Sequence, residues 1–597
     1  MKNLCQQLNQ LKDNKLLICK HIQLKKIVSN LKKQYKQHKL LRTLVLFSPV
    51  LIYLIFSVVF FALKHNFSLT HSIFTLSGDP EIFIWSFNWW PFAIAHHLNP
   101  FLTKYLWYPN GFNLTWATSI PILALLFSPV TYFFGAIASF NLMALLAPVL
   151  SAASMFYLVY VITRKYPPSL LAGYIFGFSS YEFGQLLGHT QLYVTFCIPL
   201  LIMLFILRYQ EKMKRYVFIL LSALLLAVQF GISTEIFATF ITFSFIGILI
   251  FLSFSDKKTR ILILKTTLDF GYSLVLSLII LSPFLYYLLK GYKVASNNSP
   301  KPSAFAYYST DLLNFIIPTP ITTLGHSLFV KTTAKFAGNF AEEGAYLGIS
   351  FILIFLYISI KNRKKLVYKS LAILFIFLVI AAMGPILLID GKTENLTLPW
   401  NIAEHLPLLS SAIPDRFSMY VFLVLSLIIG LWLSIKTSTR NYLIKLLVVI
   451  VAIVFILPNT SMYFWQPTPK PKLFQPNLVS RYIPRGSNVI ILPYGYLGNS
   501  MLYQPESRMD FTQSGGYIGS TPINFAQNPL INSFYNSALL TNFKPLLINF
   551  CKQNKVTRII YRPDTSKVLV KELKSLNWKS ISVGKSVVIY VTKKELS

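Results

Sequence analysis

Long apolar runs, separated by short polar or basic segments, recur along most of the 597-residue chain. A helix needs about 20 consecutive apolar residues to cross a bilayer, and many of these runs approach that length. The pattern therefore predicts an all-α polytopic membrane bundle with about 11–13 transmembrane helices. The predicted spans cover about residues 43–62, 139–163, 168–181, 190–207, 216–233, 236–253, 262–289, 346–360, 366–388, 418–435 and 441–459.

The loops between these spans alternate in charge. Lys and Arg gather on the cytoplasmic side of membrane proteins, so we place the N-terminus and the basic loops in the cytoplasm and the remaining loops outside. The basic loops lie at residues 164–165, 208–215, 257–260, 361–365 and 436–440.

Residues 117–135 form a further apolar segment, interrupted by Pro121 and Pro129. If it crossed the membrane, the basic pair Arg164-Lys165 would face outside, against the positive-inside rule. We therefore predict a re-entrant or surface-lying segment. The alternative is twelve or more spans, with one basic loop outside.

Composition supports a membrane protein. Only 13% of the residues are charged and 54% are hydrophobic, whereas soluble domains carry about 25% charged residues. The formal net charge of +35 would suggest nucleic-acid binding in a soluble protein, but here the cations flank apolar spans, so that function is excluded. The four cysteines have neither metal-ligand nor disulfide spacing.

The two ends of the chain differ from the middle. Residues 1–42 carry eleven Lys or Arg and one acid, which predicts a basic cytoplasmic tail able to contact anionic membrane lipids. Residues 466–597 have shorter alternating runs and more turn residues. We predict strands at 487–495, 555–562 and 586–592 and a helix at 566–576, forming a small α/β extracytoplasmic domain.

Carboxylates are rare and unevenly placed. Residues 43–460, the predicted transmembrane domain, contain fourteen of them. A carboxylate near a bilayer is costly and usually marks a functional or paired site, so this distribution favours a site at the outer surface. A competing interpretation is that outer loops avoid Lys and Arg and accumulate acids by default. Those at predicted outer positions are Asp79, Glu81, Glu182, Glu235, Asp311, Glu342, Glu343, Asp390, Glu394, Glu404 and Asp415.

The first outer loop, residues 64–116, holds five of the nine tryptophans and begins with Gly78-Asp79-Pro80 after the first span. Residues 81–97 are apolar and aromatic at helical spacing, which favours a helix lying along the membrane surface. We expect that helix to hold Asp79 at headgroup depth. Asp79 could equally be an N-capping residue of a turn.

Several short motifs accompany this loop: Gly78-Asp79-Pro80, Asn99-Pro100-Phe101, Tyr108-Pro109, Gly188-His189, Glu342-Glu343-Gly344, Tyr346-Leu347-Gly348 and Pro414-Asp415-Arg416-Phe417. With them, the arrangement resembles the C-type (GT-C) integral-membrane glycosyltransferases, which take a sugar from a polyprenyl-phosphate carrier on the side opposite the cytoplasm. The resemblance implies a bacterial inner-membrane enzyme whose acceptor is an envelope glycan, lipid or protein. A divalent metal is an open question, because the second acidic motif of some members is not clearly present.

The resemblance implies roles for several residues. Asp79 would be the general base, giving direct displacement with inversion. Arg416 would neutralise the donor phosphate, unless it pairs with Asp415 or Glu404 instead. Further donor or phosphate candidates are Lys104 and His189, and the candidates for binding sugar hydroxyls are Glu182, Glu235, Glu342, Glu343 and Tyr346.

Glu182, His189 and Glu235, with His96 or His97, could alternatively bind a metal ion. Two other functions also compete with a transferase: a transporter or flippase for lipid-linked saccharides, and a non-catalytic scaffold for polysaccharide export. Transporters usually place ionisable residues near the middle of spans, where only Asp269 lies here.

Overall fold

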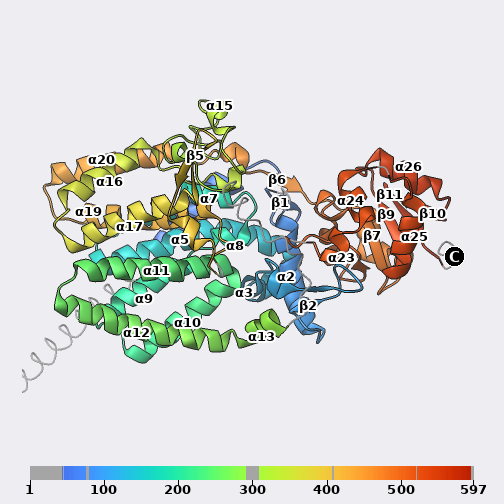
Figure 1. Ribbon diagram of the computed structural model, residues 1–597, viewed down its shortest axis with the longest axis horizontal. Helices are drawn as coiled ribbons and strands as arrows, with labels where there is room; N and C mark the ends of the chain where they lie inside the picture. The colour runs from blue at the N-terminus through green and yellow to red at the C-terminus, as the bar shows by residue number, and fades with distance from the viewer. Residues whose placement is uncertain are drawn as a thin grey trace, which may run out of the picture.

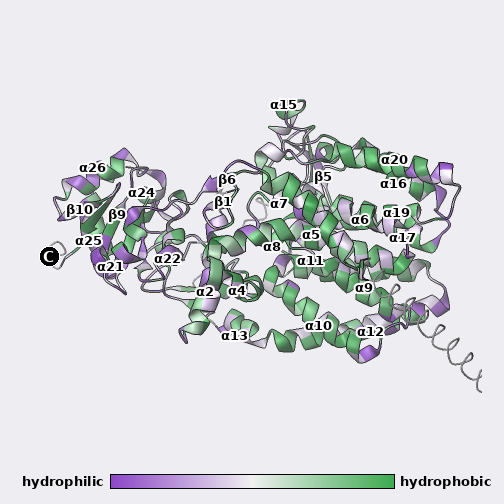
Figure 2. Ribbon diagram, turned by 180° about the vertical axis from the view of Figure 1, so that it is seen from behind, coloured by the Kyte–Doolittle hydropathy of each residue, from purple (hydrophilic) through white to green (hydrophobic). Residues whose placement is uncertain are grey.

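The computed structural model describes residues 43–44, 46–75, 79–290, 308–406, 409–519, 521–538 and 540–592. The predicted basic tail, residues 1–42, lies outside this part of the chain. The described residues form a bundle of apolar helices and, beyond one end of it, a smaller α/β part (Figure 1). Most bundle helices are coloured hydrophobic, whereas hydrophilic residues gather in the α/β part and in the loops (Figure 2).

Six helices are long and apolar enough to cross a membrane, as a multi-pass membrane protein requires. Three shorter apolar helices cover Leu46–Ala62, Gly348–Lys361 (α16) and Leu366–Ala382 (α17). Helices of full spanning length are thus fewer, among the described residues, than the predicted 11–13 spans. The six are Ala136–Thr163 (α5), Thr190–Tyr209 (α8, Thr190–Tyr193, and α9, Cys197–Tyr209), Arg215–Ile232 (α10), Thr234–Phe254 (α11), Lys257–Ile280 (α12) and Pro414–Leu433 (η5, Pro414–Phe417, and α19, Ser418–Leu433).

Short elements connect these helices. Polar side chains cap the first turns of several helices. Ser233 accepts a hydrogen bond from the Ile236 backbone N–H at the start of α11, and Asp311 accepts one from the Leu313 backbone N–H at the start of η3. The other elements of this region are α6 (Tyr166–Gly177), α7 (Ser180–Gln185), α13 (Ser282–Lys290), η3 (Leu312–Phe315), α15 (Val330–Thr333), η4 (Phe340–Glu342), β4 (Ile386–Ile389), β5 (Lys392–Thr397), α18 (Trp400–Ala403) and α20 (Thr439–Phe455).

The segment 117–135 forms two short helices, α3 (Pro121–Leu126) and α4 (Ser128–Phe134). Pro121 and Pro129 lie in the first turns, where a missing N–H costs nothing. At 1.5 Å per residue each helix is about 9–11 Å long, and a bilayer core is about 30 Å thick. Neither helix can cross.

The first outer loop contains the predicted aromatic helix, α2 (Pro80–Ala95), together with β1 (Ser72–Phe74), β2 (Leu102–Thr103), β3 (Phe112–Asn113) and η2 (Leu114–Trp116). The aromatic side chains of α2 are buried within the protein, and the position of this helix at the membrane surface stays a prediction. Trp85, Trp89 and Trp90 are at most 2% exposed, because α2 packs against α3 and α5 on one side and against η9 (Ser500–Leu502) of the C-terminal part on the other.

The C-terminal part contains a five-stranded sheet with the order β10-β11-β9-β7-β8. β7 (Asn488–Leu492) pairs in parallel with β8 (Thr512–Gln513) and β9 (Val556–Tyr561), and β11 (Ser586–Tyr590) is antiparallel to β9 and β10 (Ser580–Val583). Both faces of the sheet are covered: Ile559 and Ile589 belong to one apolar cluster, and their neighbours Ile560 and Val588 belong to another. The helices around the sheet are α21 (Pro476–Tyr482), α22 (Tyr503–Glu506), α23 (Ile523–Ala526), α24 (Pro529–Asn536), α25 (Phe543–Gln553) and α26 (Lys567–Ser575).

The two parts are joined through the first outer loop. β1 pairs with β6 (Trp465–Pro467), and the β8 region exchanges backbone hydrogen bonds with residues 105–108. The β8 edge of the sheet therefore faces the bundle, and the β10 edge is the far one (Figures 1 and 2).

Candidate functional site

Asp79 lies where the C-terminal part meets the bundle. It is the residue before α2, yet its side chain makes no capping hydrogen bond. Its carboxylate instead accepts a hydrogen bond from the Tyr517 hydroxyl at 2.9 Å and lies 3.3 Å from Nε2 of His189. The side chain is 30% exposed, so a substrate can reach it. The N-cap interpretation of Asp79 is therefore wrong for its side chain.

His189 follows α7 and is oriented by Gln185, one turn earlier on that helix. The Gln185 amide nitrogen donates to the backbone carbonyl of Ala341 at 2.8 Å, which turns its oxygen toward Nδ1 of His189, also at 2.8 Å. Nδ1 therefore carries a proton and Nε2 faces Asp79. When the ring is protonated at Nε2 as well, its N–H donates to the Asp79 carboxylate.

Two further carboxylates surround Arg416. Its guanidinium donates to Glu342 through Nε and Nη2 and to Glu235 through Nη1, the two Nη contacts being 2.5 Å long. Glu342 also lies 3.7 Å from Nδ1 of His189. The alternative partners considered for Arg416, Asp415 and Glu404, are not used; the Thr310 hydroxyl donates to Asp415.

These contacts form one continuous network, which we call the Asp79 cluster. Its members are Tyr517, Asp79, His189, Gln185, Glu342, Arg416 and Glu235. The exposed fraction falls from Asp79, at 30%, through His189, at 16%, to Glu342, at 2%. The cluster thus has an accessible end at Asp79 and a buried interior.

The cluster controls the protonation of its carboxylates. Burial acts to raise the pKa of Asp79, but the hydrogen bonds and charges of His189, Tyr517 and Arg416 outweigh burial and hold that pKa below its usual value. Burial likewise opposes ionisation of Glu342, whose pKa is nevertheless lowered, first by the charge of Arg416 and then by His189. Both side chains are therefore carboxylates at neutral pH.

Four of the residues singled out from the sequence lie outside these contacts. Glu182 is buried, its Oε1 has no hydrogen-bond partner among the described residues, and burial raises its pKa. Burial also raises the pKa of Glu343 to about 8. Tyr346 is buried and uses its backbone carbonyl to accept a hydrogen bond from Ser180. Lys104 is exposed and has no described ion pair.

Tyr517 and Gln185 were not identified from the sequence. Gln185 could have been found by its four-residue spacing from His189, which places both on one helical face. Tyr517 carries no such signal, because it follows Asp79 by more than 400 residues and reaches it only through the fold.

The described residues contain no arrangement that supports the metal site considered from the sequence. No group of three or more His, Cys, Asp or Glu among them is arranged to hold a metal ion. His96 and His97 lie at the other end of α2, about 24 Å along the helix from Asp79.

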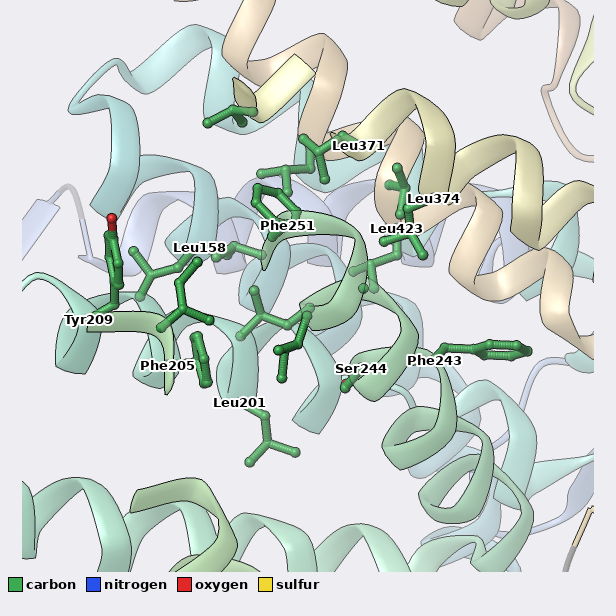
Figure 3. Close-up of a pocket in the computed structure, with 18 of the residues that line it drawn as sticks. Leu158, Leu201, Phe205, Tyr209, Phe243, Ser244, Phe251, Leu371, Leu374 and Leu423 are labelled. Atoms are coloured by element: carbon green, nitrogen blue, oxygen red, sulfur yellow. The ribbon is translucent and has the colours of Figure 1, made fainter. Parts of the chain in front are cut away.

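A large apolar pocket of about 440 Å³ lies inside the bundle, lined by α5, α9, α11, α12, α17 and α19. Leucine and phenylalanine side chains from several helices point into it (Figure 3). Tyr420 and Phe240 line it as well; they lie about one turn along their helices from Arg416 and Glu235. The pocket therefore extends into the bundle from beneath the Arg416–Glu235 ion pair.

A family model described as "Domain of unknown function (DUF6311)" matches residues 44–457. No curated protein matches the chain. Among solved structures, the apo oligosaccharyltransferase of Archaeoglobus fulgidus has a TM-score of 0.51 and 14% identity, with 86% of this chain and 69% of that chain covered. The arabinofuranosyltransferase AftD from Mycobacteria has a TM-score of 0.49 and 12% identity, covering 92% of this chain and 42% of that chain.

A second structure of the archaeal enzyme, AglB in complex with an inhibitory peptide and a dolichol-phosphate, has a TM-score of 0.47 and 14% identity over 86% of this chain and 69% of that chain. Of these, the apo oligosaccharyltransferase has a TM-score above 0.5, and it shows that this chain shares its fold. At these identities the likeness is one of fold.

Proposed function

This chain belongs to the family described as a domain of unknown function (DUF6311), and we propose that it is a membrane glycosyltransferase. Its donor is a sugar carried on a polyprenyl phosphate, its acceptor is an envelope glycan, lipid or protein, and the reaction takes place on the extracytoplasmic face of the bacterial inner membrane. The N-terminus then lies in the cytoplasm, by the positive-inside rule.

The observation that carries the proposal is the exposure of the Asp79 carboxylate together with its contacts to His189 and Tyr517. A carboxylate next to a helix start would ordinarily cap the helix, but this one is accessible and is held by His189 and Tyr517. A carboxylate fixed by other side chains and open on one side suits a general base.

We assign to Asp79 the deprotonation of the acceptor hydroxyl. Its carboxylate accepts the proton of the acceptor hydroxyl while the hydroxyl oxygen forms the new bond to the anomeric carbon. The bond between that carbon and the phosphate oxygen breaks, and the electron pair leaves with the phosphate. One direct displacement of this kind inverts the anomeric configuration.

We assign the leaving phosphate to His189, whose Nε2 lies next to Asp79 and, when protonated, can donate to a phosphate oxygen. The sequence favoured Arg416, but its guanidinium is occupied by Glu235 and Glu342. A phosphate there would meet two carboxylates as well as one cation. Arg416 therefore acts as a positioning residue: it holds Glu342, which together with Gln185 orients the His189 ring.

The apolar pocket supports a lipid-linked donor. It lies on the bundle side of the Arg416–Glu235 pair and is lined almost entirely by hydrocarbon side chains. An isoprenoid tail is hydrocarbon and gains about 25 cal/mol for each Å² of apolar surface that leaves water. We propose that the donor's tail enters this pocket from the Arg416–Glu235 end of the cluster while its phosphate stays at His189.

The test compares polyprenyl-phosphate sugars and envelope glycans by mass spectrometry in four strains: without the protein, with wild type, with Asp79→Asn, and with Asp390→Asn. Asp390 is a matched control because it forms an ion pair with Lys335 and, among the described residues, no ion pair with a member of the cluster. We expect the null and Asp79→Asn strains to accumulate the donor and lose one sugar from a glycan. If Asp79→Asn matches wild type while the null strain is defective, the base assignment fails and a flippase or scaffold explains the defect better.

A further inference from the structure

A second pocket, of about 530 Å³, lies in the C-terminal part, and cations dominate its lining. It sits at the carboxyl end of β9, between α26 and the turn that joins β10 to β11. Ligands of open α/β sheets bind at this edge, beyond the carboxyl ends of parallel strands. Its charged lining consists of Arg562, Lys567, Lys571, Lys574 and Lys585.

The helix α26 presents its lysines in one direction. Lys567, Lys571 and Lys574 are spaced by four and three residues, so they share one face, while Leu569 and Leu573 are buried on another. The three lysines extend over about 10 Å of helix, at 1.5 Å per residue. Among the described residues none of them forms an ion pair, and neither does Lys585.

Arg562 anchors this pocket to the segment that also contacts the Asp79 region. Its guanidinium donates to the Gly498 carbonyl at 2.7 Å and to the Tyr503 hydroxyl, and pairs with Asp564. Met501 lies between Gly498 and Tyr503 in the sequence. Its backbone N–H donates to Glu81 at 3.4 Å, and its sulfur accepts a hydrogen bond from the Tyr517 backbone N–H. A single short segment therefore lies between the basic pocket and the Asp79 cluster.

We propose that the pocket binds an anionic glycan polymer, one that carries phosphodiester or carboxylate groups along its chain. A cleft lined by one sign of charge concentrates ligands of the opposite sign. The lysines are spread along a helix rather than converging on one point, which fits several charges in a row better than a single phosphate. This inference rests on the proposed function in one respect: the polymer is the acceptor, and its end reaches Asp79.

An anionic membrane surface fits the pocket less well. The β8 edge of the sheet faces the bundle, whereas α26 and the β10–β11 hairpin lie on the far side of the C-terminal part (Figures 1 and 2). A lipid headgroup would have to meet these lysines on the side of the domain that points away from the helices of the membrane.

The test measures binding of a fluorescent polyglycerol-phosphate or polyuronate to the purified full-length protein in nanodiscs of neutral lipid. Lys571→Gln/Lys574→Gln is compared with Lys544→Gln/Lys552→Gln, two exposed lysines of α25. Each exposed ion contact contributes little, so we expect loss of the two lysines to weaken binding roughly 2- to 30-fold and the control pair to leave it unchanged. Neutral dextran should not bind.

Other results would overturn the inference. Equal losses in both double variants would show a general attraction to a basic protein. Full competition by millimolar inorganic phosphate would indicate a single-phosphate site, and loss of binding to anionic vesicles in the Lys571/Lys574 variant would indicate a membrane surface. Asp79→Asn should bind the polymer like wild type. Polymer binding by wild type without any sugar transfer would contradict the proposed function and leave this inference standing.

Discussion

The ion pairs of Arg416 give a prediction about stability and its pH dependence. Glu342 is 2% exposed, and the side chains of Arg416 and Glu235 are 15% and 18% exposed. Removing one partner of a buried pair costs about 3–5 kcal/mol, because the other charge stays buried and unpaired. We expect Arg416→Gln to lower the Tm of the purified protein by roughly 6–10 °C at pH 7.5, at about 2 °C per kcal/mol for a large domain.

The pH dependence separates this cause from a general loss of packing. In wild type the pKa of Glu342 is lowered, so its stabilising effect is present above its unfolded pKa of about 4.3 and is lost as the pH falls through the folded pKa. Without Arg416, burial raises the pKa of Glu342 above the unfolded value. The folded variant then gains protons as the pH falls, and the difference in Tm from wild type narrows between pH 8 and pH 5.

Thermal unfolding in detergent micelles, followed by intrinsic fluorescence at several pH values, measures both effects. Glu342→Gln/Arg416→Gln, which removes both charges, should recover at least half of the lost Tm. Arg485→Gln is the control, because the Arg485 side chain is 79% exposed and its pair with Asp510 contributes little. A wild-type Tm for Arg416→Gln, or a difference that does not change with pH, would refute the reasoning.

Four smaller predictions concern single residues. Tyr517→Phe removes a hydrogen bond that lowers the pKa of Asp79, so the acid side of the pH–rate profile should move to higher pH. The kcat should fall up to about tenfold. A profile with an unchanged apparent pKa would contradict the role of the Tyr517–Asp79 hydrogen bond. His189→Asn should move the acid side of the profile further, because His189 has the larger effect on the same carboxylate, and it should lower kcat about 100-fold; a smaller change than in Tyr517→Phe contradicts the assignment. Glu343, with a pKa raised to about 8, makes wild type lose stability as the pH rises from about 4.3 to 8, so Glu343→Gln should have the higher Tm at pH 8 and a similar Tm at pH 4; no gain at pH 8 would contradict this. Lys104→Ala should leave the rate of sugar transfer unchanged. A tenfold loss of rate would show that Lys104 takes part in the reaction.

Local sequence pattern predicted the elements of this fold better than their lengths. The strands β7, β9 and β11 and the helix α26 all lie within segments predicted as strands and helix. The number of spans was less predictable, because apolarity marks a membrane segment without fixing how far its helix extends. Residues 168–181 were predicted as a span, for example, but α6 ends at Gly177 after 12 residues.

The position of α2 shows a limit of the same kind. Aromatic residues at helical spacing suit a lipid-facing helix and a protein-buried helix equally well. What buries Trp85 is a partner from the far end of the chain: its indole N–H donates to Gln504, which lies 419 residues later. No local pattern contains that information.

The members of the Asp79 cluster were partly visible in the sequence. The rarity of acids drew attention to Asp79, Glu235 and Glu342, and the resemblance added His189 and Arg416. Their pairing was not predictable, since it depends on how α2, α7, η4 and α11 approach one another. The same rarity also selected Glu182, which the fold buries away from these contacts.

The central claim is that the Asp79 carboxylate serves the chemistry of sugar transfer. Its most direct test is a single-turnover assay with purified wild type, Asp79→Asn and Asp390→Asn, each given a lipid extract that contains the polyprenyl-phosphate sugars of the host together with its envelope glycans. The account predicts that Asp79→Asn binds the lipid-linked sugar but transfers it at least 100-fold more slowly than wild type and Asp390→Asn do. Transfer by Asp79→Asn at the rate of wild type would contradict it.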